Sequence, residues 1–577
     1  MNFVDADPAL RPLLDGILAP DDRARIEPIL DDIGHTAAGE IDRLAAVADA
    51  HPPTLRQYDP SGERIDEVDY HPAYQRLREL AFQRYGLAAM SHRPGVLGWP
   101  APASHVVKYA LSYVFVQSEF GLACPLSMTD SAARILRLFG GRETFGAEID
   151  ALSSPTLDGL STGAMFMTEK QGGTDIAQTA TEATDHGSHW MLRGNKWFAS
   201  NVSADVILTL ARVPGQGTGT RGLGMFMVPK TRPDGTRNSY RIDRLKDKLG
   251  ARSMASGEVT LEDAYAVPVG ELTRGFLQMA EMLNVSRLSN AMRAAALMRR
   301  AVFESVQHTR QRIVFGTPLF DQPLMRVTLL PLLLAAEAAL GLVLESAARL
   351  DAADAGDEVA QRLVRILTPL AKYTVCKQAR AVTGEAMEIR GGNGYIEDWV
   401  NPRLVRDAHL GSIWEGSSNV IALDVLRCLR SEHAHHTLAE AYLARLRRLE
   451  DPGTEDPGLE TTVGRLIEQW QGLVKEGDAL LGRNRAEQEA TSGSFAQVLA
   501  KTVMATLLTE QADREIAAGR GHRKILLANT YACALLGAGP ALPEALRWLN
   551  QLADGGSVPA EAALAAAAPL TGPQGAA

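Results

Sequence analysis

A glutamate in a glycine-flanked loop is the residue in this sequence best suited to acid–base chemistry. Glu415 lies in the segment Ile413-Trp-Glu-Gly-Ser-Ser-Asn419, just before polar residues that can begin a helix, and an apolar helical stretch follows from Val420 to Leu429. A loop carboxylate of this kind can project into a cavity and take a proton from a substrate. The alternative is a carboxylate that only stabilises the N-terminus of the next helix.

A glycine-rich loop lies earlier in the chain, in Met165-Phe-Met-Thr-Glu-Lys-Gln-Gly-Gly-Thr-Asp175. A strand-like start runs into polar residues and two adjacent glycines. Because glycine has no side chain, such a loop can bring backbone N–H groups close to a planar, acceptor-rich ligand. An ordinary turn is the alternative.

Two adjacent aromatic residues follow in Gly194-Asn-Lys-Trp-Phe-Ala-Ser-Asn201. In a strand, Trp197 and Phe198 point to opposite faces, so one can pack in the core while the other covers a flat cofactor. Taken alone, the pattern favours both rings in the core.

Two further turns carry polar groups. In Arg310-Gln-Arg-Ile-Val-Phe-Gly-Thr-Pro-Leu319, at the end of a helix, an arginine can hold a pyrophosphate because its fork matches phosphate oxygens. A cation stabilising the helix C-terminus is the alternative. The segment Gly391-Gly-Asn-Gly-Tyr395 is a glycine-rich turn upstream of Glu415.

Two other motifs indicate no chemistry of their own. The GxGxxG pattern from Gly217 to Gly222 precedes a strand-like segment rather than a helix, so a hairpin loop is favoured over a phosphate-binding turn. The histidines His433, His435 and His436 are interpreted as an exposed helix-end loop, and no metal site is predicted.

The chemistry-bearing segments fall in regions of different periodicity. The pattern is mostly helical from Pro20 to about Leu160, and helical again from Phe276 to Arg430 in long stretches typical of a bundle. Between about Ser161 and Gly275 it predicts a small antiparallel β domain. Its strands are expected at His189–Leu192, Asp205–Arg212, Met225–Val228 and Glu258–Leu261. A loop at Leu449–Glu460, further helices to about Ala567 and a frayed tail at 571–577 complete the prediction.

Composition excludes several classes of protein. The 577 residues are 46% hydrophobic and 22% charged, with a net charge of −10, which argues against a chain that mainly coats nucleic acid. Four scattered cysteines form no CxxC pair, so neither disulfides nor a zinc site is indicated, and a reducing cytosol is expected. The N-terminus lacks the pattern of a signal peptide. The apolar stretch Val327–Leu350 is expected to be a buried helix that is too short to span a membrane.

In their order along the chain, the segments that contain Gly173, Trp197, Arg312, Gly391 and Glu415 together resemble the acyl-CoA dehydrogenase family. Asp247–Pro268 is similar to the family segment that closes the β domain, and Pro52–Tyr74 and Pro233–Ser253 give a closer likeness to the AidB-type, adaptive-response branch. The resemblance implies an α+β, mainly helical fold in four parts. These are an N-terminal helical domain (1–160), a middle β-barrel domain (161–275), a C-terminal four-helix bundle (276–431) and a C-terminal helical extension (432–577).

The resemblance also implies a role for individual residues. Glu415 matches the catalytic base, and Arg287, on a helix expected at Asn284–Arg300, would lie near the acyl-CoA path. Thr174 would lie at the substrate-side end of the flavin. The implied FAD contacts are Met167, Thr168, Thr174, Phe198, Ser200, Arg312, Phe315, Glu388, Gly391, Gly392 and Ser417, of which Arg312, Phe315 and the Gly391–Gly392 turn would reach the FAD of a neighbouring subunit.

Four residues depart from the family pattern. Lys170 replaces the loop proline, Phe198 stands where many members have tryptophan, and Ser417 replaces threonine. Glu388 occupies a position at the adenosine end of the FAD where a glutamine often contacts the cofactor. None of these changes removes the implied chemistry.

The implied activity is FAD-dependent α,β-dehydrogenation of an acyl-CoA, with Glu415 removing a proton and a hydride passing to flavin N5. An electron-transfer flavoprotein as electron acceptor and a homo-oligomer, dimer or tetramer, are implied as partners. The sequence leaves the acyl chain open. The alternatives are an AidB-type flavoprotein of the DNA alkylation response that binds DNA with little dehydrogenase activity, and a flavin-binding scaffold without turnover.

Charge favours the enzyme over DNA binding. Residues 432–577 hold 13 Lys/Arg against 18 Asp/Glu, whereas a DNA-binding extension should be basic. Local basic patches at Arg445, Arg447, Arg448 and at Arg520, Arg523, Lys524 alternate with acids and are interpreted as solvated helix faces. The stretch Lys230–Arg252, with 8 basic and 3 acidic residues, has the charge to meet a phosphate of CoA or of DNA.

Overall fold

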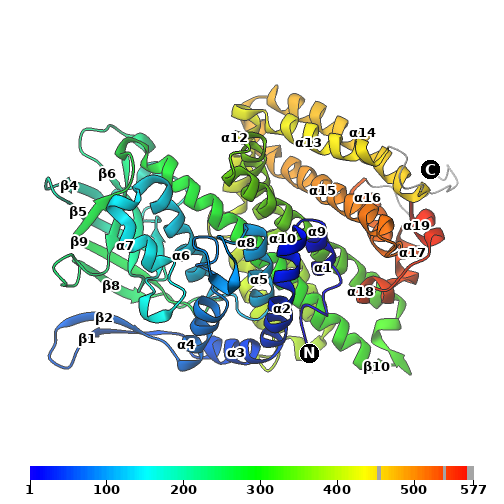
Figure 1. Ribbon diagram of the computed structural model, residues 1–577, viewed down its shortest axis with the longest axis horizontal. Coiled ribbons are helices and arrows are strands. Elements are labelled where there is room, and N and C mark those ends of the chain that lie inside the picture. The colour runs from blue at the N-terminus through cyan, green and yellow to red at the C-terminus, as the bar shows by residue number, and fades with distance from the viewer. Residues whose placement is uncertain (451–455, 537–540, 568–577) are drawn as a thin grey trace. The chain divides into compact units, whose positions relative to one another are not determined.

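The computed structural model describes residues 1–450, 456–536 and 541–567 and divides the chain into two compact units (Figure 1). One, the barrel unit, is Thr36–Ser289. The other, the bundle unit, is Met1–His35 together with Asn290–Ala577. The long helix α8 (Gly275–Gln311) runs from the first into the second. The predicted tail at 571–577 and part of the predicted loop at Leu449–Glu460 lie outside the described residues.

Short helices precede the strands of the barrel unit. They are α3 (Asp42–Ala50), α4 (Pro72–Arg78), α5 (His105–Val116), α6 (Ala123–Ile135) and α7 (Arg142–Leu152). Between α3 and α4 lies a two-stranded hairpin, β1 (Thr54–Tyr58) and β2 (Arg64–Asp69). The prediction of a mostly helical segment here missed this hairpin. Its strands, Thr-Leu-Arg-Gln-Tyr and Arg-Ile-Asp-Glu-Val-Asp, are rich in polar and charged residues and do not show the regular apolar alternation by which a strand is predicted.

Seven strands of the barrel unit form one sheet. They are β3 (Gly163–Phe166), β4 (Glu182–Asp185), β5 (Trp190–Ser200), β6 (Val206–Arg212), β7 (Leu223–Pro229), β8 (Tyr240–Leu245) and β9 (Ser256–Pro268). Pairing runs from β6 through β4, β5, β9 and β7 and returns to β6, which closes a barrel. Closure leaves these strands with few open edges. The predicted middle β barrel is therefore confirmed.

Two details of the predicted sheet are wrong. The sheet is not purely antiparallel, since β6 pairs in parallel with β3 and with β4. The strands β5 and β9 also extend well beyond the short segments expected. Both errors concern pairing over long sequence distances, which the period of a single strand does not encode.

Apolar side chains fill the interior of the barrel. Phe166, Leu192, Ile207, Phe226 and Val259, from five strands, all belong to one buried cluster. Each lies at an inward position of its strand, as the period-2 alternation of a strand requires. Burial of these side chains sets which residues of β5 face outward.

Long helices make up the bundle unit. Besides α8 they are α1 (Leu10–Asp15), α2 (Pro20–Thr36, of which Thr36 belongs to the barrel unit), α9 (Pro323–Asp354), α10 (Glu358–Ile389), α11 (Asn401–Gly411) and α12 (Ser418–Glu432). A small hairpin, β10 (Ile313–Val314) and β11 (Thr317–Pro318), separates α8 from α9. The helix α10 packs against α9, α11 and α12. This agrees with the predicted helical bundle.

The predicted C-terminal extension is helical. It comprises α13 (Ala434–Leu449), α14 (Pro457–Leu481), α15 (Arg485–Ala517), α16 (Arg523–Leu536), α17 (Ala541–Arg547), α18 (Leu549–Asp554) and α19 (Ala560–Ala567). Figure 1 shows α13 and α14 side by side, and α15 packs against α9, α10 and α12. The extension is therefore joined to the bundle along several helices.

The apolar helix α9 is longer than the sequence pattern suggested. Among the described residues it is the one helix whose length and composition suffice to cross a membrane, which corrects the expectation that it is too short. Within the protein, 78% of its most apolar window is buried. Core helices of globular proteins can be as long and as apolar, because neighbouring helices cover their apolar side chains in place of lipid.

Buried charges join α9 to the extension. Both Arg523 and Lys524 of α16 pair with the Glu337 carboxylate, and Lys524 Nζ lies 2.7 Å from Glu337 Oε2. All three side chains are at most 4% exposed. The interpretation of these two cations as a solvated helix face is therefore wrong. Arg445, from α13, is also held, between the carboxylates of Glu345 and Glu510.

The pKa of Glu337 reflects this pairing. Burial by itself raises the pKa of the carboxyl group, but the charges and hydrogen bonds of Arg523 and Lys524 outweigh that effect and lower the pKa to about 2. The carboxylate is therefore ionised throughout the physiological range.

Substituting Glu337→Gln should destabilise the protein by about 3–5 kcal/mol, because two buried cations lose their counter-charge. Urea unfolding followed by circular dichroism measures the change. The exposed Glu440→Gln on α13 is the matched control and should change stability by less than about 0.5 kcal/mol. Equal effects of the two substitutions would contradict a role for the buried pairs.

The difference between the native chain and Glu337→Gln should also depend on pH. Because the folded-state pKa is lower than that of an unfolded glutamate, about 4.3, the stabilisation is present above that value and is lost as pH falls toward about 2. The difference between the unfolding midpoints of the two proteins should therefore shrink progressively below about pH 5 and disappear near pH 2. A constant difference would contradict the assignment.

Candidate functional site

The glycine-rich loop after β3 is a tight turn. The Glu169 N–H donates to the Gly172 carbonyl (3.2 Å) and the Gly172 N–H donates to the Glu169 carbonyl (3.0 Å). A Cβ atom on Gly173 would lie 2.7 Å from Thr168 Oγ1, so glycine is required there for packing. These contacts hold the start of the loop in a compact turn.

A buried ion pair holds this loop to the barrel. The Lys196 ammonium, from β5, donates to Glu169 Oε1 (2.8 Å) and to the Leu210 carbonyl (3.1 Å). Thr181 Oγ1 and the Ala180 N–H donate to the same carboxylate. Burial by itself raises the pKa of Glu169, but the Lys196 charge and these hydrogen bonds lower it overall. Neither Glu169 nor Lys196 was singled out from the sequence, since each looks like an ordinary surface charge.

Trp197 and Phe198 lie beside this loop, and the Trp197 N–H donates to the Thr168 carbonyl (2.8 Å). Phe198 is 55% exposed, and the Lys246 ammonium lies 3.4 Å from the centre of the Trp197 ring and 5.1 Å from that of Phe198. The expectation of both rings in the core is wrong. The β5–β9 register shifts between Lys196 and Ala199, and this bulge turns both aromatic residues away from the interior.

Five predicted FAD contacts thus lie along one loop and one strand of the barrel unit. Met167 and Thr168 are half-buried, Thr174 is exposed, and Ser200 Oγ lies 3.2 Å from Ser256 Oγ on β9. Arg287 belongs to the same unit and lies half-buried on α8, which is longer than the predicted helix. The other seven predicted residues belong to the bundle unit.

In the bundle unit, Glu415 lies in a loop with unusual backbone geometry. The loop joins α11 to α12, and Glu415 has φ +57° while Gly416 has φ +101°. Left-handed geometry is costly for a glutamate and persists only where the surroundings impose it. The Glu415 side chain is half-buried, with Oε2 shielded from solvent. Ser417 is the N-cap residue of α12, but its hydroxyl makes no capping hydrogen bond.

Buried polar side chains impose this geometry. The Lys372 ammonium of α10, 1% exposed, donates to the Gly416 carbonyl. Asn290 of α8 accepts from the Trp414 indole N–H (2.8 Å) and donates to the Gly411 carbonyl (2.8 Å). The Arg293 guanidinium lies 4.6 Å from the centre of the Trp414 ring. Sequence reasoning missed these anchors, because the position of a polar residue in a helix does not reveal its partner on another segment.

The remaining predicted residues lie on two turns. Phe315 and Gly316 form the tip of the β10–β11 hairpin, both with positive φ, and the Phe315 side chain is 98% exposed. Arg312 precedes the hairpin and is exposed. A two-residue turn of this geometry matches the twist of its strands.

The second turn follows α10 and begins at Gly391, with φ +66°. Glu388, Gly391 and Gly392 are all exposed there. A Cβ on Gly394 would lie 2.1 Å from the Met387 carbonyl oxygen, so this glycine is required. Arg390 anchors the turn through Asn401 Oδ1 (2.7 Å) and Glu304.

Three family models match the chain. The Acyl-CoA dehydrogenase, C-terminal domain, matches residues 273–429, the middle domain of the same family matches residues 164–264, and the Adaptive response protein AidB N-terminal domain matches residues 1–153. The matched segments contain all thirteen predicted site residues. They also confirm the predicted resemblance and fold class.

Relatives cover most of the chain. AidB of Escherichia coli is 35% identical over 488 residues, which is 81% of this chain and 83% of that protein. Acyl-CoA dehydrogenase family member 11 of Caenorhabditis elegans is 31% identical over 545 residues, 91% of this chain and 86% of that protein. The solved structure of C. elegans ACDH-11 in complex with C11-CoA has a TM-score of 0.83 at 28% identity and covers 92% of this chain and 91% of that one.

A second solved structure, the apo-form of Bd2924, has a TM-score of 0.79 at 29% identity, and the match covers 89% of this chain and 98% of that one. Identity above 30% over more than four fifths of two relatives, together with the three matching domains, establishes common ancestry across nearly the whole length. The chain belongs to the acyl-CoA dehydrogenase family.

Proposed function

We propose that this protein is an FAD-dependent acyl-CoA dehydrogenase that uses Glu415 as its base. The observation that carries the proposal is the strained left-handed backbone at Glu415, imposed by the buried side chains Lys372 and Asn290. Strain of this kind persists where the surrounding structure over-determines it and is typical of catalytic residues. A glutamate that only capped a helix would need no such support.

The residues of the barrel unit suit a flavin. Phe198 offers an exposed aromatic face, Met167 and Thr168 lie half-buried beside it, and the turn at Gly173 leaves backbone close to the surface. A planar, acceptor-rich ring system needs such a combination of apolar cover and polar backbone groups. Bound FAD would supply a hydride acceptor, which no side chain can supply.

The chemistry left to the chain is proton abstraction. The Glu415 carboxylate takes a proton from the carbon next to the thioester carbonyl, and its shielded oxygen atom lies in a setting that excludes water. That carbonyl would accept hydrogen bonds, including one from the backbone N–H of Glu415, which stabilises the developing enolate by about 3–4 kcal/mol per donor. Rigid anchoring by Lys372 and Asn290 keeps the base in place.

Several features support the partners of this proposal. The C. elegans relative is described in complex with C11-CoA, which favours an acyl-CoA thioester as substrate here. The exposed Phe315, with Arg312 before it, is suited to reach a neighbouring subunit, as a dimer or tetramer requires. An electron-transfer flavoprotein as acceptor and a cytoplasmic location complete the proposal.

DNA binding receives less support, although AidB of E. coli is a relative. Of the six cations in the two basic patches of the extension, Arg445, Arg523 and Lys524 are engaged in ion pairs that are at most 15% exposed. In the stretch Lys230–Arg252, Arg241 and Arg244 pair with neighbouring carboxylates. Cations neutralised in this way attract phosphates weakly.

Replacing Glu415 with glutamine should leave a yellow protein that keeps its FAD but no longer reacts. Anaerobic addition of straight and branched acyl-CoAs should bleach the flavin of the native chain, and the substitution should slow this step by about 10²–10⁴-fold. Stopped-flow absorbance measures the rate. Glu468→Gln, an exposed site on α14, is the control and should bleach normally. Normal bleaching in Glu415→Gln would refute the assigned base.

Lys196→Met should lower FAD retention, because Glu169 is left buried without its counter-charge and the flavin loop loses its support. The expected loss of stability is about 3–5 kcal/mol. Adding Glu169→Gln to Lys196→Met should recover part of the FAD retention and part of the stability, because the double variant no longer has an unpaired buried charge. The FAD-to-protein ratio and thermal unfolding measure these effects. Equal behaviour of the single and double variants would contradict a positioning role for the pair.

A further inference from the structure

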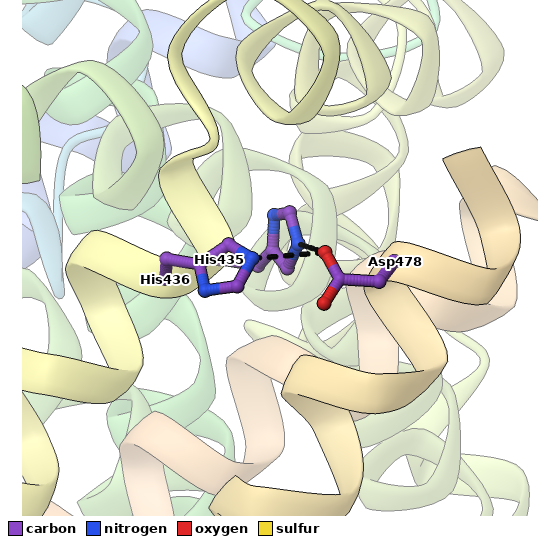
Figure 2. A group of neighbouring side chains, drawn as sticks. All are labelled: His435, His436 and Asp478. Atoms are coloured by element: carbon purple, nitrogen blue, oxygen red, sulfur yellow. Dashed lines mark hydrogen bonds and ion pairs between the residues drawn. The ribbon is translucent and has the colours of Figure 1, made fainter. Parts of the chain in front are cut away.

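A compact group of ligand-type side chains lies outside the set of residues assigned above, on the helices that follow α12. His435 and His436 belong to the first turn of α13, and Asp478 belongs to the last turn of α14. Figure 2 shows both imidazole rings directed at one carboxylate. Nε2 of His435 lies 3.0 Å and Nε2 of His436 lies 2.8 Å from the same oxygen, Asp478 Oδ1. The prediction of an exposed helix-end loop is wrong for His435, which is helical and 1% exposed.

We propose that His435, His436 and Asp478 bind a divalent transition-metal cation of the zinc type. Two imidazole nitrogens and a carboxylate oxygen are a ligand set that Zn²⁺ accepts, with metal–ligand bonds of about 2.0–2.2 Å. In a tetrahedral site such bonds place ligand atoms about 3.3 Å apart. Here the ligand atoms all lie within 4.8 Å of one another, so small side-chain rotations suffice to enclose an ion.

The helix opposite the histidines is shaped to receive one of them. A Cβ atom on Gly477 would lie 2.5 Å from Cδ2 of His435, so only glycine lets this ring rest against α14 beside Asp478. Glycine is among the least favourable residues inside a helix. The space that the missing side chain of Gly477 leaves for the His435 imidazole explains why a glycine occurs at this position.

Burial differs among the three ligands in a way that suits metal entry. His435 is enclosed, whereas the side chains of His436 and Asp478 are 47% and 54% exposed. One fixed ligand and two accessible ones allow an ion to arrive from solvent and be held. His433 lies at the junction of α12 and α13, with its ring centre 6.5 Å from that of His435 and 6.3 Å from that of His436. Either this imidazole or a water molecule can occupy a fourth position.

Binding would tie the first turn of α13 to the last turn of α14. A ligand that binds only the folded chain stabilises it in proportion to the logarithm of its concentration over Kd. The site is thus expected to be structural, strengthening the C-terminal extension. It does not depend on the flavin or on Glu415.

The test uses the tag-free, full-length protein, dialysed against a chelator and titrated with Zn²⁺ by isothermal calorimetry. We expect one ion per chain and a higher unfolding temperature, with Co²⁺ giving visible absorption bands typical of nitrogen and oxygen ligands. The variants His436→Ala and Asp478→Asn change exposed side chains, and circular dichroism verifies that they fold. Each should weaken Zn²⁺ binding by at least about tenfold.

Two further variants separate this site from adventitious binding to surface histidines. Gly477→Ala keeps every ligand but should also weaken binding, because it displaces the His435 ring. His186→Ala removes an exposed histidine of the barrel unit and should leave binding unchanged. Absence of Zn²⁺ binding in the native chain would overturn the proposal, as would affinity that is unaffected by His436→Ala and Asp478→Asn.

Discussion

The buried Lys372 ammonium donates a hydrogen bond to the Gly416 carbonyl, and this contact constrains the backbone directly after the candidate base. It fixes a carbonyl at the point where two successive residues, Glu415 and Gly416, have left-handed backbone geometry. Asn290 fixes the same loop from α8 by bonding both the Trp414 indole and the Gly411 carbonyl. An ammonium and an amide buried in this way need polar partners, and the loop supplies them. The loop and its anchors therefore stabilise each other.

Buried ion pairs also join segments that are distant in the sequence. Glu169 with Lys196 joins a loop to a strand of the barrel, and Glu337 with Arg523 and Lys524 joins α9 to α16. Arg445 of α13 bridges Glu345 of α9 and Glu510 of α15. Each pair costs desolvation energy, so apolar residues of similar volume would often be as stable. A packing arrangement that separates the two partners leaves a buried charge unpaired and is therefore high in free energy. The ion pairs thus favour a single register between the packed elements.

The extension is acidic overall, and several of its cations are not on its surface but are paired with glutamates of α9. Arg445 neutralises Glu345, and Arg523 neutralises Glu337, within the bundle unit. Both glutamates belong to α9, whose sequence is otherwise mostly apolar. Composition alone treats all of these groups as surface charge. The acyl-CoA dehydrogenase proposal and the proposed metal site draw on different parts of the chain, and neither requires the other.

The sequence by itself determined the fold class and the family, and it identified the segments that are proposed to carry chemistry, because local periodicity and short motifs reside in consecutive residues. It placed the helix-to-strand transitions and the loops around Glu415, Gly173 and Gly391 correctly in outline. Only the tertiary structure decided how strands pair, that Trp197 and Phe198 turn outward, and that Lys372, Asn290 and Lys196 support the site. These features arise from contacts between residues far apart in the chain, where the energy of burial outweighs local preference. The same reason explains why three ordinary residues, His435, His436 and Asp478, form a cluster that no spacing in the sequence reveals.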